Sequence, residues 1–377
     1  MLRLSPPGGS RATWGSEMPL TCARSIDATR HRRMISRRMF EPKTEGMAAQ
    51  SADIIPLIDL GVLTAGLSGA REIAPVLRTA LEETGFLIVT NHGVPQDLVD
   101  ATFAEARRFH DLSLETKLSV RMNEHNNGYM AMARYNVRTS RVSEAAVLPD
   151  MNEAFFIKRE RPADDLLARA GRRFAGPNEW PDNLPGFRET LLTYTDAVDA
   201  LGRRMLPAIA LALDLPADRF DADFEESQFS FRLSHYPPVP RLAGQFGIAP
   251  HTDANFMTFL AQSGVPGLQI QGGADEWYDV PYVPRSFVVN TGDMLHRWTN
   301  GRFRSTAHRA LPPLDDHRYA IPYFFGPHLD TMIECLPTCC DAARPVKYAP
   351  ITYGDYVAWW YDSNYAVADQ EDVRVEA

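Results

Sequence analysis

The stretches Pro250-His251-Thr252-Asp253 and Thr306-Ala307-His308-Arg309 carry the residues around which the rest of the chain is organised. On an extended backbone, residues two positions apart point to the same side, so His251 and Asp253 can occupy neighbouring positions around one metal ion. A third ligand must come from elsewhere, and we predict that it is His308. Two imidazoles and one carboxylate on one face of an octahedron leave three positions open, which is typical of non-haem iron(II) oxygenases, whereas zinc favours a tetrahedral site.

The tripeptide His251-Thr252-Asp253 alone is weak evidence, because such a sequence also occurs by chance as a solvated surface pair. Further polar motifs follow it in the chain. They are Asn290-Thr291-Gly292-Asp293, Trp298-Thr299-Asn300-Gly301 and Arg318, which lies about ten residues after His308. This ordered set resembles the isopenicillin N synthase-like family of iron(II) and 2-oxoglutarate-dependent oxygenases. The resemblance covers residues 55–365.

The composition of the 377-residue chain restricts its partners. A formal net charge of −9 argues against a nucleic-acid-binding protein, which needs a basic face to replace phosphate counterions. No uninterrupted apolar run is long enough to cross a bilayer. Four cysteines are too few for a disulfide framework and indicate a reducing compartment. We therefore expect a cytoplasmic enzyme that acts on a small molecule, with no nucleic-acid or membrane partner.

The N-terminal residues 1–46 differ from the rest of the chain because they are rich in arginine and lack periodic apolar residues. Such a leader is typical of a transit peptide or of upstream sequence included by an early start codon, and we favour the second interpretation, with Met47 as the natural start. We expect residues 1–46 to be disordered. Residues 47–225 are predicted to form a mixed α/β region packed on a core at residues 226–377, and the two to form one cooperative domain.

The region after the leader shows alternating strand and helix signals. Residues 55–60 read as a short strand, residues 73–81 have apolar positions at helical spacing, and residues 86–89 read as a buried strand. Two further helices are predicted at residues 98–118 and 187–213. This region is therefore expected to supply scaffold.

The C-terminal region changes to short strands separated by Gly, Pro and Asp turns, which favours a double-sheet jelly roll. A helix is predicted at residues 353–360. The fold class is thus mostly β with flanking helices (α+β), and the resemblance implies a double-stranded β-helix core. The predicted strands of this core are residues 229–236, 258–260, 268–270, 287–290, 308–311 and 320–325.

The resemblance also implies how the co-substrate binds. 2-Oxoglutarate would chelate iron(II) through its 1-carboxylate and 2-keto oxygen, and dioxygen would take the last open position. Arg318 would bind the distal carboxylate, because a guanidinium matches a carboxylate bidentately, and Tyr236 would donate a phenolic hydrogen bond. Decarboxylation to succinate would then allow hydroxylation, desaturation or ring formation on a small organic molecule.

Two positions depart from the family pattern. Where the family usually has Arg-x-Ser, this chain has Arg318-Tyr319-Ala320, and where the family often has Asn-x-Tyr, it has Ser234-His235-Tyr236. Ser234 stays a candidate co-substrate contact, although each lost hydrogen bond weakens binding by about 0.5–1.5 kcal/mol. Two alternatives therefore stay open, a 2-oxoglutarate-independent iron oxidase of the isopenicillin N synthase type and an ethylene- and succinate-forming enzyme. A non-catalytic small-molecule-binding protein is more distant, since it needs no iron triad.

Substrate contacts are implied by the resemblance in residues 129–156, which would fold over the mouth of the active site. The alternative is that polar residues there are simply solvated. His92, His235 and His296 lack ligand spacing, and we expect them to be structural. The candidate substrate contacts are Tyr129, Arg134, Asn152 and Glu153.

Overall fold

A computed structural model describes residues 54–133, 135–137, 148–162, 164–240, 242, 244–272 and 276–367. The predicted leader at residues 1–46 and the candidate substrate contact Arg134 lie outside these residues. Within the described ranges, none of the helices combines the length and apolar character needed to cross a membrane.

The first described elements form a strand, helix and strand. Strand β1 (Leu57–Asp59) pairs in parallel with β2 (Phe86–Thr90), and a 3-10 helix (Leu60–Ala65) and α2 (Leu67–Glu83) connect them. Gly85 ends α2 with a positive φ of 68°, and a Cβ there would lie 2.3 Å from a backbone oxygen. The helix and both strands predicted for this region are confirmed.

The helices α3 (Gln96–His110) and α4 (Leu114–Ser119) replace the single helix predicted at residues 98–118, which was wrong. The break occurs because the Ser113 hydroxyl accepts a hydrogen bond from the backbone N–H of Thr116 at 3.2 Å and caps a new helix. The long helix α6 (Phe187–Ala212) agrees with the prediction and packs against α2 and α3. The other described helix in this region is α5 (Leu166–Arg169).

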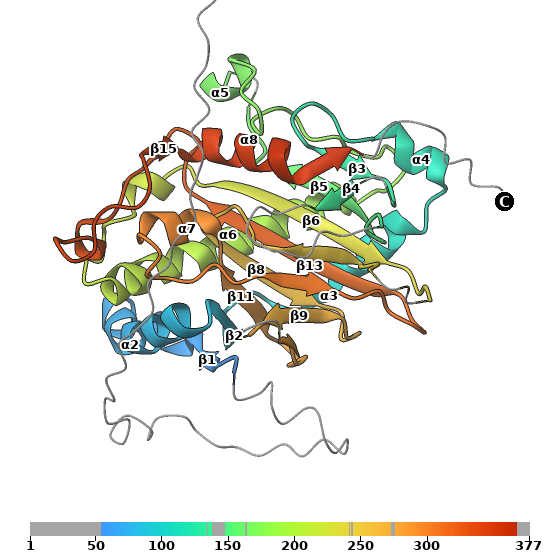
Figure 1. Ribbon diagram of the computed structural model, residues 1–377. Coiled ribbons are helices and arrows are strands. Elements are labelled where there is room, and N and C mark those ends of the chain that lie inside the picture. The colour runs from blue at the N-terminus through green and yellow to red at the C-terminus, as the bar shows by residue number, and fades with distance from the viewer. Residues whose placement is uncertain are drawn as a thin grey trace, which may run out of the picture. The chain divides into compact units, whose positions relative to one another are not determined.

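An eight-stranded sheet combines strands from both halves of the chain (Figure 1). Its strand order is β1-β2-β11-β8-β13-β6-β5-β3, and α3 and α6 pack on one of its faces. The strands not yet introduced are β3 (Gly128–Met130), β5 (Glu153–Lys158), β6 (Gln228–Tyr236), β8 (Met257–Gln262), β11 (Phe287–Thr291) and β13 (Arg318–Gly326).

A four-stranded sheet in the order β10-β9-β12-β7 completes the jelly roll, which confirms the predicted fold class. Its strands are β7 (Ile248–His251), β9 (Leu268–Gln271), β10 (Trp277–Asp279) and β12 (His308–Ala310). The remaining described elements are α7 (Asp293–Trp298), α8 (Tyr353–Asn364), 3-10 helices at Ala222–Phe224 and Pro337–Cys339, and the pairs β14 (Met332–Ile333) with β15 (Ile351–Thr352) and β4 (Tyr135–Val137) with β16 (Tyr365–Val367).

The described parts of residues 129–156 form strands, and the prediction that this stretch folds over the active-site mouth stays a prediction because residues 138–147 lie outside the described residues. Its two ends, β3 and β5, extend the eight-stranded sheet beyond β6. Between them, β4 pairs with β16 and lies next to β7, the strand that ends at His251. Near the start of β5, Asp150 also contacts β7, because its Oδ1 accepts a hydrogen bond from the backbone N–H of Ala249 at 2.9 Å.

Strand β6 is buried on both faces, and its side chains alternate between the cavity on one side and the helices on the other. Arg232 and Tyr236 line a cavity between the two sheets together with His251. Leu233 and His235, which alternate with them, face the helices, where the backbone oxygen of Leu233 lies 3.1 Å from a His110 ring nitrogen on α3. We call these two sides of the sheet the cavity face and the helix face.

Candidate active site

The three predicted iron ligands converge at the cavity face. His251 ends β7 and His308 begins β12, and the two are direct cross-strand partners with ring centroids 4.3 Å apart. The Asp253 Oδ1 atom lies 3.7 Å from His251 Nε2 and 3.5 Å from His308 Nε2. One ligand atom from each residue thus lies within 4.8 Å of the other two.

Hydrogen bonds from the far side of each imidazole fix which nitrogen is available. His251 Nδ1 donates to the backbone oxygen of Ala249 at 2.8 Å, and His308 Nδ1 lies 3.3 Å from the backbone oxygen of Thr306. A carbonyl oxygen only accepts, so each Nδ1 carries the hydrogen and each Nε2 keeps its lone pair. Both lone pairs belong to the atoms that converge with Asp253.

Hydrogen bonds also hold the oxygen atom of Asp253 that faces away from the two imidazoles. Its Oδ2 accepts hydrogen bonds from Thr258 Oγ1 at 2.6 Å and Asn290 Nδ2 at 2.8 Å, which leaves Oδ1 for a metal. Burial alone would raise the pKa of Asp253, but the neighbouring His308 and His251 hold it below its ordinary value. The carboxylate is therefore ionised, and two imidazoles with one carboxylate on an open face fit iron(II).

The two histidines respond differently to this carboxylate. Burial, aided by the charge of His308, lowers the pKa of His251 to about 3. Burial also acts to lower the pKa of His308, but the Asp253 charge outweighs it and the net shift is upward. The upward shift means that Asp253 favours a positive charge beside it. A bound metal ion would supply that charge in place of a proton on His308.

Arg318 lines the same cavity and carries a buried charge. Its side chain is 1% exposed, and its Nε and Nη1 atoms have no hydrogen-bond partner among the described residues. The guanidinium lies 4.7 Å from the ring centroid of Tyr236, its cross-strand partner. A buried cation without an anion is costly, so this arrangement is suited to binding the carboxylate of a ligand.

The two positions that depart from the family pattern, residues 234 and 320, are neighbours in the structure. Ala320 on β13 is the direct cross-strand partner of Ser234 on β6. Ala320 lines the cavity, and the buried Ser234 Oγ has no hydrogen-bond partner within the described part of the chain. The missing hydroxyl at residue 320 and the shortened side chain at residue 234 therefore affect the same part of the wall.

Tyr129 and Glu153 do not reach the cavity, which corrects their prediction as substrate contacts. Glu153 pairs with His235, so strand alternation places it on the helix face. There it accepts hydrogen bonds from Lys117 Nζ at 2.8 Å, from His235 Nδ1 at 2.7 Å and from the Tyr129 hydroxyl. Both candidates belong to a buried charge network.

Asn152 lies one residue before β5 and connects to the cavity through an arginine that the sequence interpretation missed. Its Oδ1 accepts a hydrogen bond from Arg232 Nη2, and its Nδ2 donates to the backbone oxygen of Gly247 at 2.5 Å. Arg232 itself lines the cavity. A signal for it existed, because Arg232 lies two and four residues before Ser234 and Tyr236 on a predicted strand.

The three histidines expected to be structural do not line this cavity. His92 Nδ1 accepts from the backbone N–H of Val94 at 3.2 Å, and His296 Nδ1 donates to the backbone oxygen of Phe303 at 2.7 Å. His235 belongs to the charge network on the helix face. Their contacts agree with a structural role.

Comparisons with known proteins give the same assignment over most of the chain. The sequence model of the 2OG-Fe(II) oxygenase superfamily matches residues 227–327, and the model of the N-terminal region of non-haem dioxygenases in morphine synthesis matches residues 55–183. A 2-oxoglutarate-Fe(II) type oxidoreductase, hxnY of Emericella nidulans, is 34% identical over 325 residues, covering 83% of this chain and 91% of that protein.

Two further relatives extend the comparison. Homoarginine-6-hydroxylase of Glycine max is 31% identical, covering 80% of this chain and 95% of that protein. The crystal structure of a full-length Neurospora crassa protein in complex with alpha-KG and thymine matches with a TM-score of 0.71 and 30% identity, over 82% of this chain and 97% of that one. The predicted enzyme class, an iron- and 2-oxoglutarate-dependent dioxygenase acting on a small molecule, is therefore confirmed. The chain belongs to the 2OG-Fe(II) oxygenase superfamily, as its resemblance to the isopenicillin N synthase-like family predicted.

Proposed function

We propose that this dioxygenase hydroxylates a C–H bond of a small organic molecule, with iron held by His251, Asp253 and His308 and with 2-oxoglutarate held by Arg318 and Tyr236. The observation that carries the proposal is the buried Arg318 guanidinium, which has two unpartnered nitrogen atoms in the cavity of the converging ligand atoms. Hydroxylation is favoured because one relative is named as a homoarginine-6-hydroxylase.

Each side chain has a separate task in this proposal. His251 and His308 present Nε2 and Asp253 presents Oδ1, while their other polar atoms are held by the protein. Arg318 pairs with the distal carboxylate of 2-oxoglutarate, and the Tyr236 hydroxyl donates to the same group. Iron, 2-oxoglutarate and dioxygen together supply the oxidising chemistry when bound. We propose that Ser234 contributes indirectly, by shaping the wall opposite Ala320.

The requirement for 2-oxoglutarate separates this proposal from the 2-oxoglutarate-independent oxidase, in which Arg318 would have to pair with another anion. Calorimetry tests the difference with protein loaded with Mn(II), which does not turn over. 2-Oxoglutarate should bind to the wild type and bind much more weakly to Arg318→Met. Succinate formation with Fe(II) and dioxygen is the second measurement. Substrate oxidation in the absence of 2-oxoglutarate would contradict the proposal.

We also propose that the enzyme works in the cytoplasm, without nucleic-acid or membrane partners. The net charge of −9 disfavours nucleic acid, and Cys335, Cys339 and Cys340 are free thiols, as expected in a reducing compartment. Fractionation of the producing cells tests this location. Recovery of the enzyme in an oxidising compartment or with membranes would contradict it.

The same proposal extends to the organisation of the chain. Residues 47–225 and 226–377 should unfold together, because β5 from the first part pairs with β6 from the second along six residue pairs. Residues 1–46 should be dispensable, since they lack the periodic apolar residues that offset the entropy of ordering. A chain beginning at Met47 should have the turnover and the single unfolding transition of the full chain.

A further inference from the structure

A second arginine of the cavity also has no counter-ion among the described residues. Arg232 on β6 is 4% exposed, and its Nη2 donates to the neutral amide oxygen of Asn152. The guanidinium carbon lies 5.2 Å from the ring centroid of Phe156, and the buried Nε has no hydrogen-bond partner in the described ranges. No carboxylate of the described residues forms an ion pair with Arg232, so its charge is open to an anion.

The position of Arg232 separates it from the proposed 2-oxoglutarate contact. Arg232 and Tyr236 lie on the same face of β6, four residues or roughly 13 Å apart along the strand. Tyr236 is the cross-strand partner of Arg318, so the two arginines attach at opposite ends of the cavity wall.

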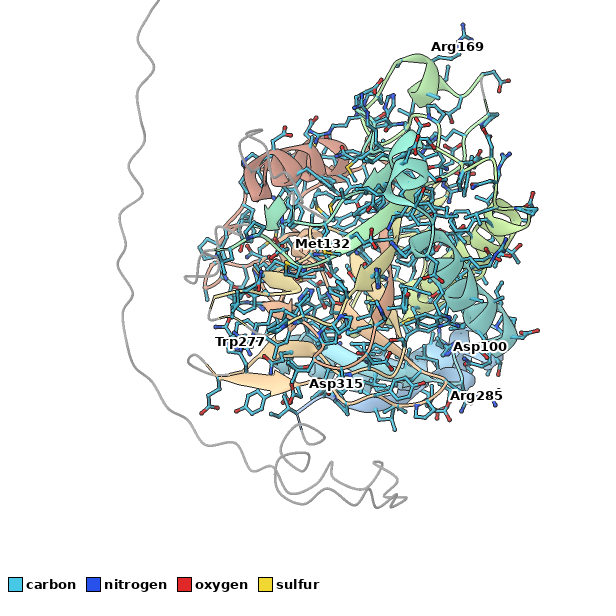
Figure 2. The ribbon with its side chains drawn as sticks, turned by 90° about the vertical axis from the view of Figure 1, so that its right-hand side faces the viewer. Asp100, Met132, Arg169, Trp277, Arg285 and Asp315 are labelled. Atoms are coloured by element: carbon cyan, nitrogen blue, oxygen red, sulfur yellow. The ribbon has the colours of Figure 1, made fainter. Side chains whose placement is uncertain are left out.

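The charges that line the cavity also favour the binding of an anion. Asp253 is the one carboxylate among its described lining residues, and it stands against the charges of Arg232 and Arg318. Iron(II) and the 2-oxoglutarate dianion would cancel each other. Arg309, whose guanidinium carbon lies 4.0 Å from the centroid of the Trp277 ring labelled in Figure 2, also donates to Gln269 and is left out of this balance. With both cofactors bound, the cavity would still carry excess positive charge, which a further anion would offset.

We propose that Arg232 binds a carboxylate of the substrate, and hence that the substrates are small carboxylic acids with an apolar body. This inference rests on the proposed function. A guanidinium matches the planar carboxylate bidentately, and Asn152 positions it because its own amide is fixed on Gly247. The body of the substrate would meet the apolar lining, which includes Phe86, Leu260, Pro322 and Phe324.

The test uses matched probes, because the natural substrate is unidentified. A set of aryl and alkyl carboxylic acids, their primary amides and the corresponding phosphate monoesters would be screened by ligand-observed NMR against protein loaded with Zn(II) and 2-oxoglutarate. Affinities of the binders would then be measured by calorimetry. In the wild type, acids should bind about tenfold or more tightly than their amides, the effect of one charge-assisted hydrogen bond.

Variants assign this preference to a residue. Arg232→Met should abolish the preference for acids and change the affinity for 2-oxoglutarate by less than about threefold, whereas Arg232→Lys should keep part of the preference. Arg71→Gln removes an exposed positive charge on α2 and should change neither affinity. Arg318→Met should weaken 2-oxoglutarate binding. Melting temperatures of all variants would show whether each is folded.

Three results would overturn the assignment of Arg232. The wild type could bind acids and amides equally, it could prefer the phosphate monoesters, or Arg232→Met could lose affinity for 2-oxoglutarate while keeping its preference for acids. The proposed function fails separately, if the metal-loaded wild type does not bind 2-oxoglutarate or if Arg318→Met binds it as well as the wild type does. The two failures are therefore distinguished by which ligand is affected.

Discussion

Two clusters of two histidines and one carboxylate occur in the described part of this enzyme, and they differ in what balances the carboxylate. His251, Asp253 and His308 converge at the cavity face, and His110, Glu153 and His235 converge at the helix face. In both clusters the three ligand atoms lie within 4.8 Å of one another. Convergence of donor atoms therefore does not distinguish a metal site from a structural network.

The cluster on the helix face already contains its cation. The Lys117 ammonium lies 2.8 Å from Glu153 Oε2, and His110 Nδ1 lies 3.4 Å from Glu153 Oε1. His235 continues the network to His317, with 2.7 Å between their ring nitrogens. No described lysine or arginine forms an ion pair with Asp253, which instead faces two imidazole nitrogens. The comparison indicates that the cavity face is built for an added cation and the helix face for a permanent one.

The largest expected effect is the loss of catalysis in Asp253→Ala. The substitution removes the only charged ligand, so iron-dependent succinate formation should fall below detection, and His251→Ala and His308→Ala should behave alike. The fold should persist, because the backbone pairing of β12 with β7 and β9 does not depend on these three side chains. Circular dichroism and thermal melting provide the control. Residual turnover would reject the triad, and an unfolded variant would indicate a structural metal.

Glu153→Gln should affect stability more than catalysis. It leaves the buried Lys117 without its anion, and breaking such a pair costs about 3–5 kcal/mol. Urea denaturation measures the loss, and iron affinity at the cavity face should be unchanged. Adding Lys117→Met removes the stranded charge and should recover part of the stability. A clear loss of iron affinity in the single variant would show that the helix-face cluster also holds metal.

The pH dependence of stability sharpens the same test. Burial would raise the pKa of Glu153, but hydrogen bonds from His110, His235 and Lys117 outweigh it and hold the pKa well below the ordinary 4.5. Because the folded-state pKa is depressed, this stabilisation is present above pH 4.5 and is lost as the pH falls further. The difference in unfolding free energy between wild type and Glu153→Gln should therefore shrink below pH 4.5, and a constant difference would contradict this origin.

The two faces also show what can be read from the sequence. The His251 and Asp253 spacing predicts two ligands from strand geometry alone, and alternation along β6 links Arg232 to Tyr236. The register of β5 against β6 has no such local signal. A shift of one residue would exchange Asn152 and Glu153 between the faces, and only the pairing of Glu153 with His235 decides it. The prediction of Glu153 as a substrate contact was wrong for this reason.

Arg318→Ala should raise the KM for 2-oxoglutarate by tens-fold or more. The distal carboxylate would lose its ion-pair partner in a buried site, at a cost of about 2–5 kcal/mol. Arg318→Lys should recover only part of this affinity, because a lysine lacks the bidentate geometry. Succinate formation at varied 2-oxoglutarate concentration measures both variants. An unchanged KM in Arg318→Ala would reassign the co-substrate site.

The smallest expected effect concerns the wall between the two faces, where Ala320 lies directly opposite Ser234. Ala320→Ser restores the hydroxyl that the family usually has, and its side chain points into the cavity lined by Arg318. One additional hydrogen bond contributes about 0.5–1.5 kcal/mol, so 2-oxoglutarate should bind about 2- to 12-fold more tightly. Calorimetry on metal-loaded protein measures this gain, and Ala320→Val, which adds bulk without a hydroxyl, is the control. If the added hydroxyl instead donates its hydrogen to the unpartnered Ser234 Oγ, the variant should gain thermal stability and not affinity for 2-oxoglutarate. The two measurements together therefore tell whether this part of the wall contacts the co-substrate or only packs behind it.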